Sequence, residues 1–84
     1  MIKKCYVYIL RCADNSYYTG ITSNLKVRIW QHNHGYKSCL QKSKIPVLLV
    51  YQESFLNRVE AAKREKEIKG WGRRKKELLI NSLH

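Results

Sequence analysis

The chain has 84 residues, with 17 lysine and arginine side chains against six acidic ones, so its formal net charge is +11. This length allows one small domain, predicted over residues 1–84, and leaves no room for a second. The longest apolar run, from Cys5 to Leu10, is too short to cross a membrane, so no membrane association is predicted. The three cysteines lack the paired spacing of a zinc site or a disulfide framework, which predicts reduced thiols and a cytoplasmic location.

The positive charge is unevenly distributed along the chain. Residues 15–52 contain no carboxylate, and every acid except Asp14 lies at or beyond Glu53. A large positive surplus favours a polyanionic partner, most simply nucleic acid. We therefore predict that the acid-free segment 15–52 faces phosphates through Lys26, Arg28, Lys37, Lys42 and Lys44. The alternative is a highly soluble basic domain whose lysines only face water.

The N-terminal half predicts two strands followed by a helix. Residues 5–12 and 17–22 are rich in aromatic and β-branched side chains, and the short polar segment between them favours a hairpin turn. Ser23 or Asn24 can cap a helix over residues 25–34, because both side chains accept hydrogen bonds from helical N–H groups.

A third strand and two further helices are predicted in the C-terminal half. Val47–Tyr51 is a nearly continuous apolar run, which indicates a strand covered on both faces. Asn57 or Ser54 can cap a helix that ends at Lys69 and carries an apolar stripe formed by Phe55, Val59 and Ala62. The last helix is predicted from Arg73 to about Leu83 and should bury Leu79, Ile80 and Leu83. The predicted order is β-β-α-β-α-α.

Five residues are candidates for a shared site. Tyr8 and Tyr18 lie on the two hairpin strands, and Arg28 and His32 share one face of the first helix. Glu60 lies beside the apolar stripe of the second helix, where it could be partly buried. Each residue also has an ordinary structural explanation: strand packing for the tyrosines, a surface pair for Arg28 and His32, and a capping box for Glu60.

Taken together, these residues resemble the GIY-YIG nuclease superfamily, in its small, stand-alone bacterial branch. The triplet 6–8, Tyr-Val-Tyr, precedes the triplet 18–20, Tyr-Thr-Gly, and Arg28, His32 and a helical Glu60 follow in order. The resemblance covers about residues 5–81, although the first triplet is not literally Gly-Ile-Tyr. It implies an α+β fold with a small three-stranded antiparallel sheet flanked by helices, in agreement with the predicted order.

The resemblance also implies an activity, the divalent-metal-dependent hydrolysis of a phosphodiester by an endonuclease in DNA repair or nucleic-acid processing. It makes Tyr8 and Tyr18 the paired motif tyrosines, one at the attacking water and the other at the scissile phosphate. Arg28 becomes the cation that stabilises the transition state, and His32 an assisting acid or base, or a phosphate contact. Glu60 becomes the ligand of Mg²⁺ or Mn²⁺, and one carboxylate with waters and phosphate oxygens suits Mg²⁺.

This chemistry places two demands on the tyrosines. A phenol with a pKa of about 10 is a poor base at neutral pH, so Arg28 or the metal must lower that pKa. A shared site also requires both rings on one face of the sheet, whereas pairing Cys12 with Tyr17 would place them on opposite faces. A shared site therefore needs an odd register or a β-bulge, and we predict a bulge near residues 14–16.

Three classes of function remain open. The leading prediction is a nuclease that acts on nucleic acid, DNA rather than RNA, as a monomer or weak dimer and without a small-molecule cofactor. The alternative is a non-catalytic nucleic-acid-binding module of the same fold. A protein-interaction or accessory domain would use Trp30 and Trp71, although tryptophans in so small a domain usually pack in the core or at its edge.

Overall fold

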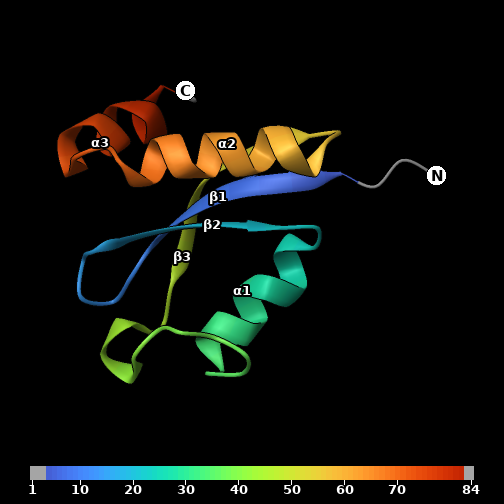
Figure 1. Ribbon diagram of the computed structural model, residues 1–84. Helices are drawn as coiled ribbons and strands as arrows, with labels where there is room; N and C mark the ends of the chain where they lie inside the picture. Colours follow the sequence, from blue (N-terminus) through green and yellow to red (C-terminus); the bar gives the residue numbers. More distant parts are fainter. Residues whose placement is uncertain (1–3, 83–84) are drawn as a thin grey trace.

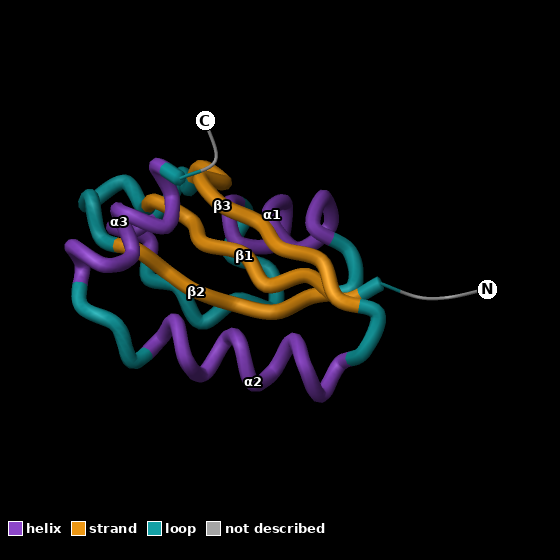
Figure 2. Tube along the Cα trace, turned by 90° about the horizontal axis from the view of Figure 1, so that it is seen from above, coloured by secondary structure: helices purple, strands orange, loops and turns teal. Residues whose placement is uncertain are grey.

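The computed structural model describes residues 4–82 and shows a three-stranded sheet between two layers of helix (Figure 1). All neighbouring strands are antiparallel, in the order β2-β1-β3, so that β1 lies in the centre (Figure 2). The strands are β1 (Cys5–Arg11), β2 (Tyr17–Thr22) and β3 (Leu48–Phe55). The helices are α1 (Leu25–Asn33), α2 (Arg58–Lys69) and α3 (Arg73–Asn81), with a short 3-10 turn, η1, at Lys42–Lys44. The predicted α+β fold and element order are confirmed.

The hairpin turn decides which residues share a face of the sheet. Asn15 N donates to Cys12 O and Cys12 N donates to Ser16 O, each at 2.8 Å, and Asn15 has a left-handed φ of 70°. This pattern matches the three-residue hairpin connection in which a left-handed residue forms a bulge, so the predicted bulge is present at the turn. It pairs Tyr8 with Gly20 and Leu10 with Tyr18, which places both tyrosines on one face.

The third strand lies at an edge of the sheet, and the prediction that it is covered on both faces is wrong because two of its leucines are exposed. Leu48 is 60% exposed and Leu49 is 36% exposed, whereas Val7, Ile9 and Leu10 of the central strand β1 are 0% exposed. An apolar run indicates a strand but does not distinguish the centre of a sheet from its edge, because that depends on pairing between distant segments.

Each face of the sheet carries its own core. On one face, under α2 and α3, Val7 and Ile9 pack with Ala61 and Ile68. On the other face, Tyr8, Leu10, Cys12 and Val47 pack against Leu25 and Ile29 of α1. The two layers are visible in Figure 1, with α2 and α3 above the sheet and α1 below it. Within residues 4–82, no helix has the length and apolar character needed to span a membrane.

The N-terminal caps of α1 and α2 match their predictions, whereas the predicted buried face of α2 does not. Asn24 caps α1 by accepting from Val27 N, and Asn57 caps α2 by accepting from Val59 N and Glu60 N. The predicted apolar stripe of α2 is wrong, because Val59 is 61% exposed and Ala62 is also exposed, while Ala61 and Ile68 face the sheet. Leu79 and Ile80 of α3 pack at the edge of the core, and Leu83 lies outside the described residues.

Candidate functional site

Four of the five predicted site residues lie together between the sheet and α1. The hydroxyl of Tyr8 lies 3.0 Å from Nε2 of His32, which comes from α1. The Tyr18 ring lies 6.4 Å from the Tyr8 ring and 5.1 Å from the His32 ring, measured between centroids. Arg28 lies one turn before His32 on α1. The register of the hairpin and the spacing along α1 together assemble this group.

Gly20 makes room for the Tyr8 side chain. It lies opposite Tyr8 on the neighbouring strand, and a Cβ atom there would lie 2.5 Å from the Tyr8 hydroxyl and 2.6 Å from Cζ. The Tyr8 ring therefore crosses directly over the backbone of β2. Any side chain at position 20 would displace the hydroxyl from His32.

Residues 37–39, which we call the strap, hold the site from outside. The chain turns back toward α1 through left-handed conformations at Gly35 and Lys37, with φ of 64° and 51°. Each strap residue then contacts one site residue: the Lys37 carbonyl accepts from Arg28 at 2.8 Å, Ser38 Oγ lies 2.7 Å from His32 Nδ1, and Cys39 Sγ lies 3.8 Å from the Tyr18 hydroxyl. Neither Ser38 nor Cys39 was predicted as a site residue, because their contacts depend on how the chain turns back toward α1.

Burial dominates the ionisation of the site. Loss of solvent lowers the pKa of His32 to about 4, and the Arg28 charge adds to this effect, so the imidazole is neutral at physiological pH. Burial, with contributions from Cys39 and Tyr8, raises the pKa of Tyr18 to about 12. The pKa of Tyr8 is also raised by burial, and Arg28 lowers it only in part. Arg28 alone does not bring the pKa of either phenol below its ordinary value, because desolvation outweighs the nearby guanidinium.

Glu60, the predicted metal ligand, is not brought to the other four residues. It lies in the first turn of α2, its side chain is 59% exposed, and its carboxylate pairs with Lys63 Nζ at 3.7 Å. A shallow pocket beside it is lined by Phe55, Glu60, Lys63, Arg64 and Glu67.

Glu65 is the carboxylate on the side of α2 that faces the sheet. It follows Ala61 by four residues and precedes Ile68 by three, and those two residues are the buried positions of the helix. Its side chain is 19% exposed and pairs with Lys69 at 3.3 Å. After burial, which is the main cause, the Glu65 charge contributes to raising the pKa of Tyr8. The helical spacing of Ala61, Glu65 and Ile68 could have identified this face of α2 from the sequence. The predicted apolar stripe, with Val59 and Ala62, lies on a different face of the helix.

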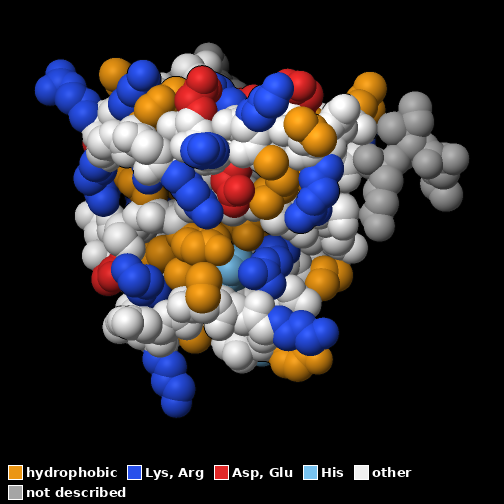
Figure 3. Space-filling view, in the orientation of Figure 1, with side chains coloured by type: hydrophobic (Ala, Val, Ile, Leu, Met, Phe, Trp, Pro, Cys, Tyr) orange, Lys and Arg blue, Asp and Glu red, His pale blue; other side chains and the backbone are white. Residues whose placement is uncertain are grey.

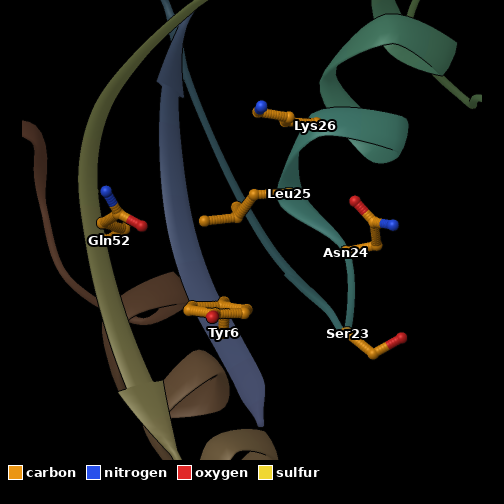
Figure 4. A pocket seen from close by; sticks show the side chains of 6 residues that line it. All are labelled: Tyr6, Ser23, Asn24, Leu25, Lys26 and Gln52. Atoms are coloured by element: carbon orange, nitrogen blue, oxygen red, sulfur yellow. The ribbon is translucent and has the colours of Figure 1, made fainter. Parts of the chain in front are cut away.

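The basic residues predicted to face phosphates have different surroundings. Lys26 lines a pocket of about 250 Å³ at the start of α1, with Tyr6, Ser23, Asn24, Leu25 and Gln52 (Figure 4). Lys37 and Lys42 are exposed, whereas Lys44 pairs with Asp14 at 2.9 Å and donates to Ser16. In Figure 3, lysine and arginine side chains are spread over the whole face, while most of the acidic ones lie in its upper half, over α2 and α3.

A metal ion at this site would depend on few protein ligands. Among residues 4–82, no group of three or more His, Cys, Asp or Glu side chains could hold a metal ion. Mg²⁺ often binds through one or two carboxylates and completes its shell with waters and substrate phosphate oxygens. The residues present therefore fit Mg²⁺ only as a cation shared between one carboxylate and a bound phosphate.

Comparison with known proteins identifies the family. The sequence model of the GIY-YIG catalytic domain matches residues 4–78. The chain belongs to the GIY-YIG family. Membership confirms the resemblance and places the chain in a family of nucleases, with nucleic acid as the substrate class.

Similar proteins are small single-domain relatives of about the same length. A UPF0213 protein of Staphylococcus haemolyticus is 49% identical over 92% of this chain and 94% of its own length. The solution NMR structure of a UPF0213 protein from Bacillus halodurans is 39% identical, with a TM-score of 0.63, over 95% of this chain and 85% of that one. A second NMR structure, from E. faecalis, is 34% identical, with a TM-score of 0.67, over 98% and 88% of the two chains. These names assign no activity.

Proposed function

We propose that this protein is a divalent-metal-dependent endonuclease that hydrolyses phosphodiester bonds in nucleic acid, DNA rather than RNA, in repair or processing within the cytoplasm. The observation that carries the proposal is the hydrogen bond of 3.0 Å between the Tyr8 hydroxyl and a neutral His32, beside Tyr18 and Arg28, in a member of the GIY-YIG family.

The reaction needs a proton acceptor for the attacking water. As the water oxygen bonds to phosphorus, Tyr8 takes a proton from the water and passes its own proton to Nε2 of His32. This transfer requires Nε2 to be unprotonated, with Nδ1–H donating to Ser38, which lies 2.7 Å away. The phosphorus–oxygen bond to the leaving sugar breaks, and that oxygen takes a proton from solvent. His32 is 0% exposed, so it acts through Tyr8 and is a positioning residue and relay rather than a phosphate contact.

The charge that develops on the phosphate needs cationic partners. Arg28 is fixed by hydrogen bonds from Nη1 to the Lys37 carbonyl and to Gln31 Oε1, at 2.8 and 3.0 Å, so its guanidinium is preorganised. A fixed guanidinium near the non-bridging oxygens stabilises a transition state in which negative charge accumulates. Tyr18, less buried than Tyr8, is assigned to the scissile phosphate as a hydrogen-bond donor, a role that its raised pKa favours.

For the metal ligand we propose Glu65 in place of Glu60. The Glu65 side chain is 19% exposed on the sheet-facing side of α2 and its charge contributes to raising the pKa of Tyr8, whereas the Glu60 side chain is 59% exposed. Each of the two acids pairs with a lysine, so the pairing does not distinguish them. When bound there with waters and phosphate oxygens, Mg²⁺ or Mn²⁺ would supply charge stabilisation and acidify a coordinated water.

The test compares the purified wild type with Glu65→Gln and Glu60→Gln in Mg²⁺ or Mn²⁺, on single-stranded, duplex and branched DNA and on RNA. The two variants make the same chemical change on the same helix. We expect Glu65→Gln to lose about 100-fold or more in cleavage while binding persists, and Glu60→Gln to stay within about threefold of the wild type. Loss of cleavage in Glu60→Gln alone would return the metal to Glu60.

A non-catalytic binding module is the second candidate. It is favoured by the raised pKa of both tyrosines and by the burial of Tyr8, which is 1% exposed, because neither phenol is a base in the free protein. Equal residual cleavage by the wild type and both glutamine variants would indicate a contaminating nuclease and support this alternative.

A further inference from the structure

Three aromatic rings lie together on the surface, outside the site described above. Trp30 is 51% exposed and Tyr36 is 53% exposed, and His34 beside them is exposed as well. The His34 ring stacks on Trp30 with centroids 4.2 Å apart and an interplanar angle of 16°, and the Tyr36 ring meets Trp30 edge-on at 6.3 Å. We call Trp30, His34 and Tyr36 the aromatic platform.

Packing within the chain does not explain the platform. The sequence predicts that both tryptophans pack in the core or at its edge. Trp71 does pack against the core, with Lys75 and Arg64 over its ring at 4.5 and 5.2 Å. Trp30 keeps half of its surface exposed even with His34 against one ring face. A large, flat apolar surface therefore remains open on α1.

The charge around the platform is suited to a phosphate backbone. All three rings belong to the acid-free segment 15–52. Lys37 Nζ lies 5.5 Å from the centre of the Tyr36 ring, and the Lys37 carbonyl holds Arg28 at 2.8 Å. The platform is thus connected to the proposed site through one residue of the strap.

We propose that the aromatic platform stacks unpaired nucleobases of the bound strand, so that the substrate carries a single-stranded segment next to the cleaved bond. This inference rests on the proposed function and deepens it. Bases of a single strand are free to stack on aromatic rings, whereas bases in a duplex already stack on one another. The open ring face of Trp30 would extend the stack of unpaired bases, and His34 covers its other face. Lys37 would contact the phosphates of the same strand on its way to Arg28.

The first measurement is affinity, by fluorescence anisotropy of labelled oligonucleotides in Ca²⁺ or without metal. Three probes of equal length are used: a single strand, the same strand made of abasic sites, and a duplex. We expect Trp30→Ala to weaken binding of the single strand about tenfold or more, and of the abasic strand and the duplex by less than about twofold. Val27→Ala is the matched control, because Val27 is 48% exposed on the same helix but aliphatic, and it should leave all three affinities unchanged.

The second measurement detects the stack directly. Trp30 and Trp71 are the two tryptophans of the chain, so Trp71→Phe leaves Trp30 as the sole indole reporter. The single strand should quench its fluorescence and the abasic strand should not. The affinity comparison does not need this variant. It therefore tests the proposal even when Trp71→Phe fails to fold.

The failure of this inference is distinguishable from that of the proposed function. Unchanged single-strand affinity in Trp30→Ala, with cleavage intact, would overturn the platform alone. A dimer that Trp30→Ala dissociates, again with unchanged affinity, would overturn it by showing contact between two copies of the chain. Absence of binding to every probe would overturn both proposals.

Discussion

Replacing Gly20 with alanine should disturb the site more than any other single methyl group added at a glycine of this chain. The new Cβ would lie 2.5 Å from the Tyr8 hydroxyl and 2.6 Å from Cζ, whereas ordinary contact begins at 3.4 Å. The difference of 3.4 − 2.5 Å means that the end of the Tyr8 ring must move by about 0.9 Å. Since Tyr8 is 1% exposed and lies against His32, this movement displaces neighbouring side chains.

The expected destabilisation follows from two contributions. Forcing an extra methyl group into a packed core lowers the free energy of unfolding by about 1–3 kcal/mol. Weakening the hydrogen bond between Tyr8 and His32 removes about 1 kcal/mol more. The total is about 2–4 kcal/mol. For a domain of this size, each kcal/mol lowers Tm by about 4–8 °C, so Gly20→Ala should melt roughly 8–32 °C below the wild type.

Thermal unfolding followed by circular dichroism gives the measurement, with Gly72→Ala as the control. A Cβ at Gly72 meets nothing within 4 Å, so that variant should unfold within a few degrees of the wild type. Gly20→Ala should also cleave more slowly than the wild type at temperatures where both proteins are folded, because Tyr8 no longer aligns with His32. A Gly20→Ala protein that melts with the wild type would refute the proposed crossing of the Tyr8 ring over β2.

Three further predictions concern His32 and the lysines. Ser38→Ala removes the hydrogen-bond partner of His32 Nδ1, so cleavage should drop roughly tenfold. The NMR chemical shifts of the imidazole nitrogens should also change. Unaltered shifts would contradict the proposed proton transfer from Tyr8 to His32. The free energy of unfolding should decrease as pH falls from about 6.5 to about 4, because the unfolded state protonates His32 in this range and the folded state does not. Urea unfolding of the wild type and of His32→Gln measures this effect. The free energy of unfolding of His32→Gln should depend less on pH. Lys42→Ala should reduce the slope of log affinity for nucleic acid against log salt concentration by about one counterion. Lys44→Ala should leave this slope unchanged, because Lys44 pairs with Asp14. Equal slopes for the two variants would contradict the assignment.

Local signals in the sequence predicted the elements of the fold well. The polar turn at residues 13–16, the caps Asn24 and Asn57, and the aromatic strands each depend on neighbouring residues alone, and each matches the structure. The requirement that Tyr8 and Tyr18 share a face predicted the irregular turn, which the left-handed Asn15 provides.

Features that depend on tertiary contacts could not be predicted in this way. The apolar run at Val47–Tyr51 could not show that its strand pairs on one side only. The contacts of residues 37–39 with the site depend on two left-handed residues and on where α1 lies against the sheet. Nothing in the local sequence distinguishes Lys44, which is paired with Asp14, from the exposed Lys42.

The assignment of the carboxylate depends on the rotational phase of α2, and this phase links the core to the proposed chemistry. Ala61 and Ile68 are both 0% exposed, so packing against the sheet fixes the orientation of the helix around its own axis. That orientation turns Glu65 toward the sheet and Glu60 toward solvent, with exposed side-chain fractions of 19% and 59%. Rotating the helix to bring Glu60 inward would expose Ala61 and Ile68, so the same contacts that stabilise the domain determine which acid of α2 lies toward the sheet.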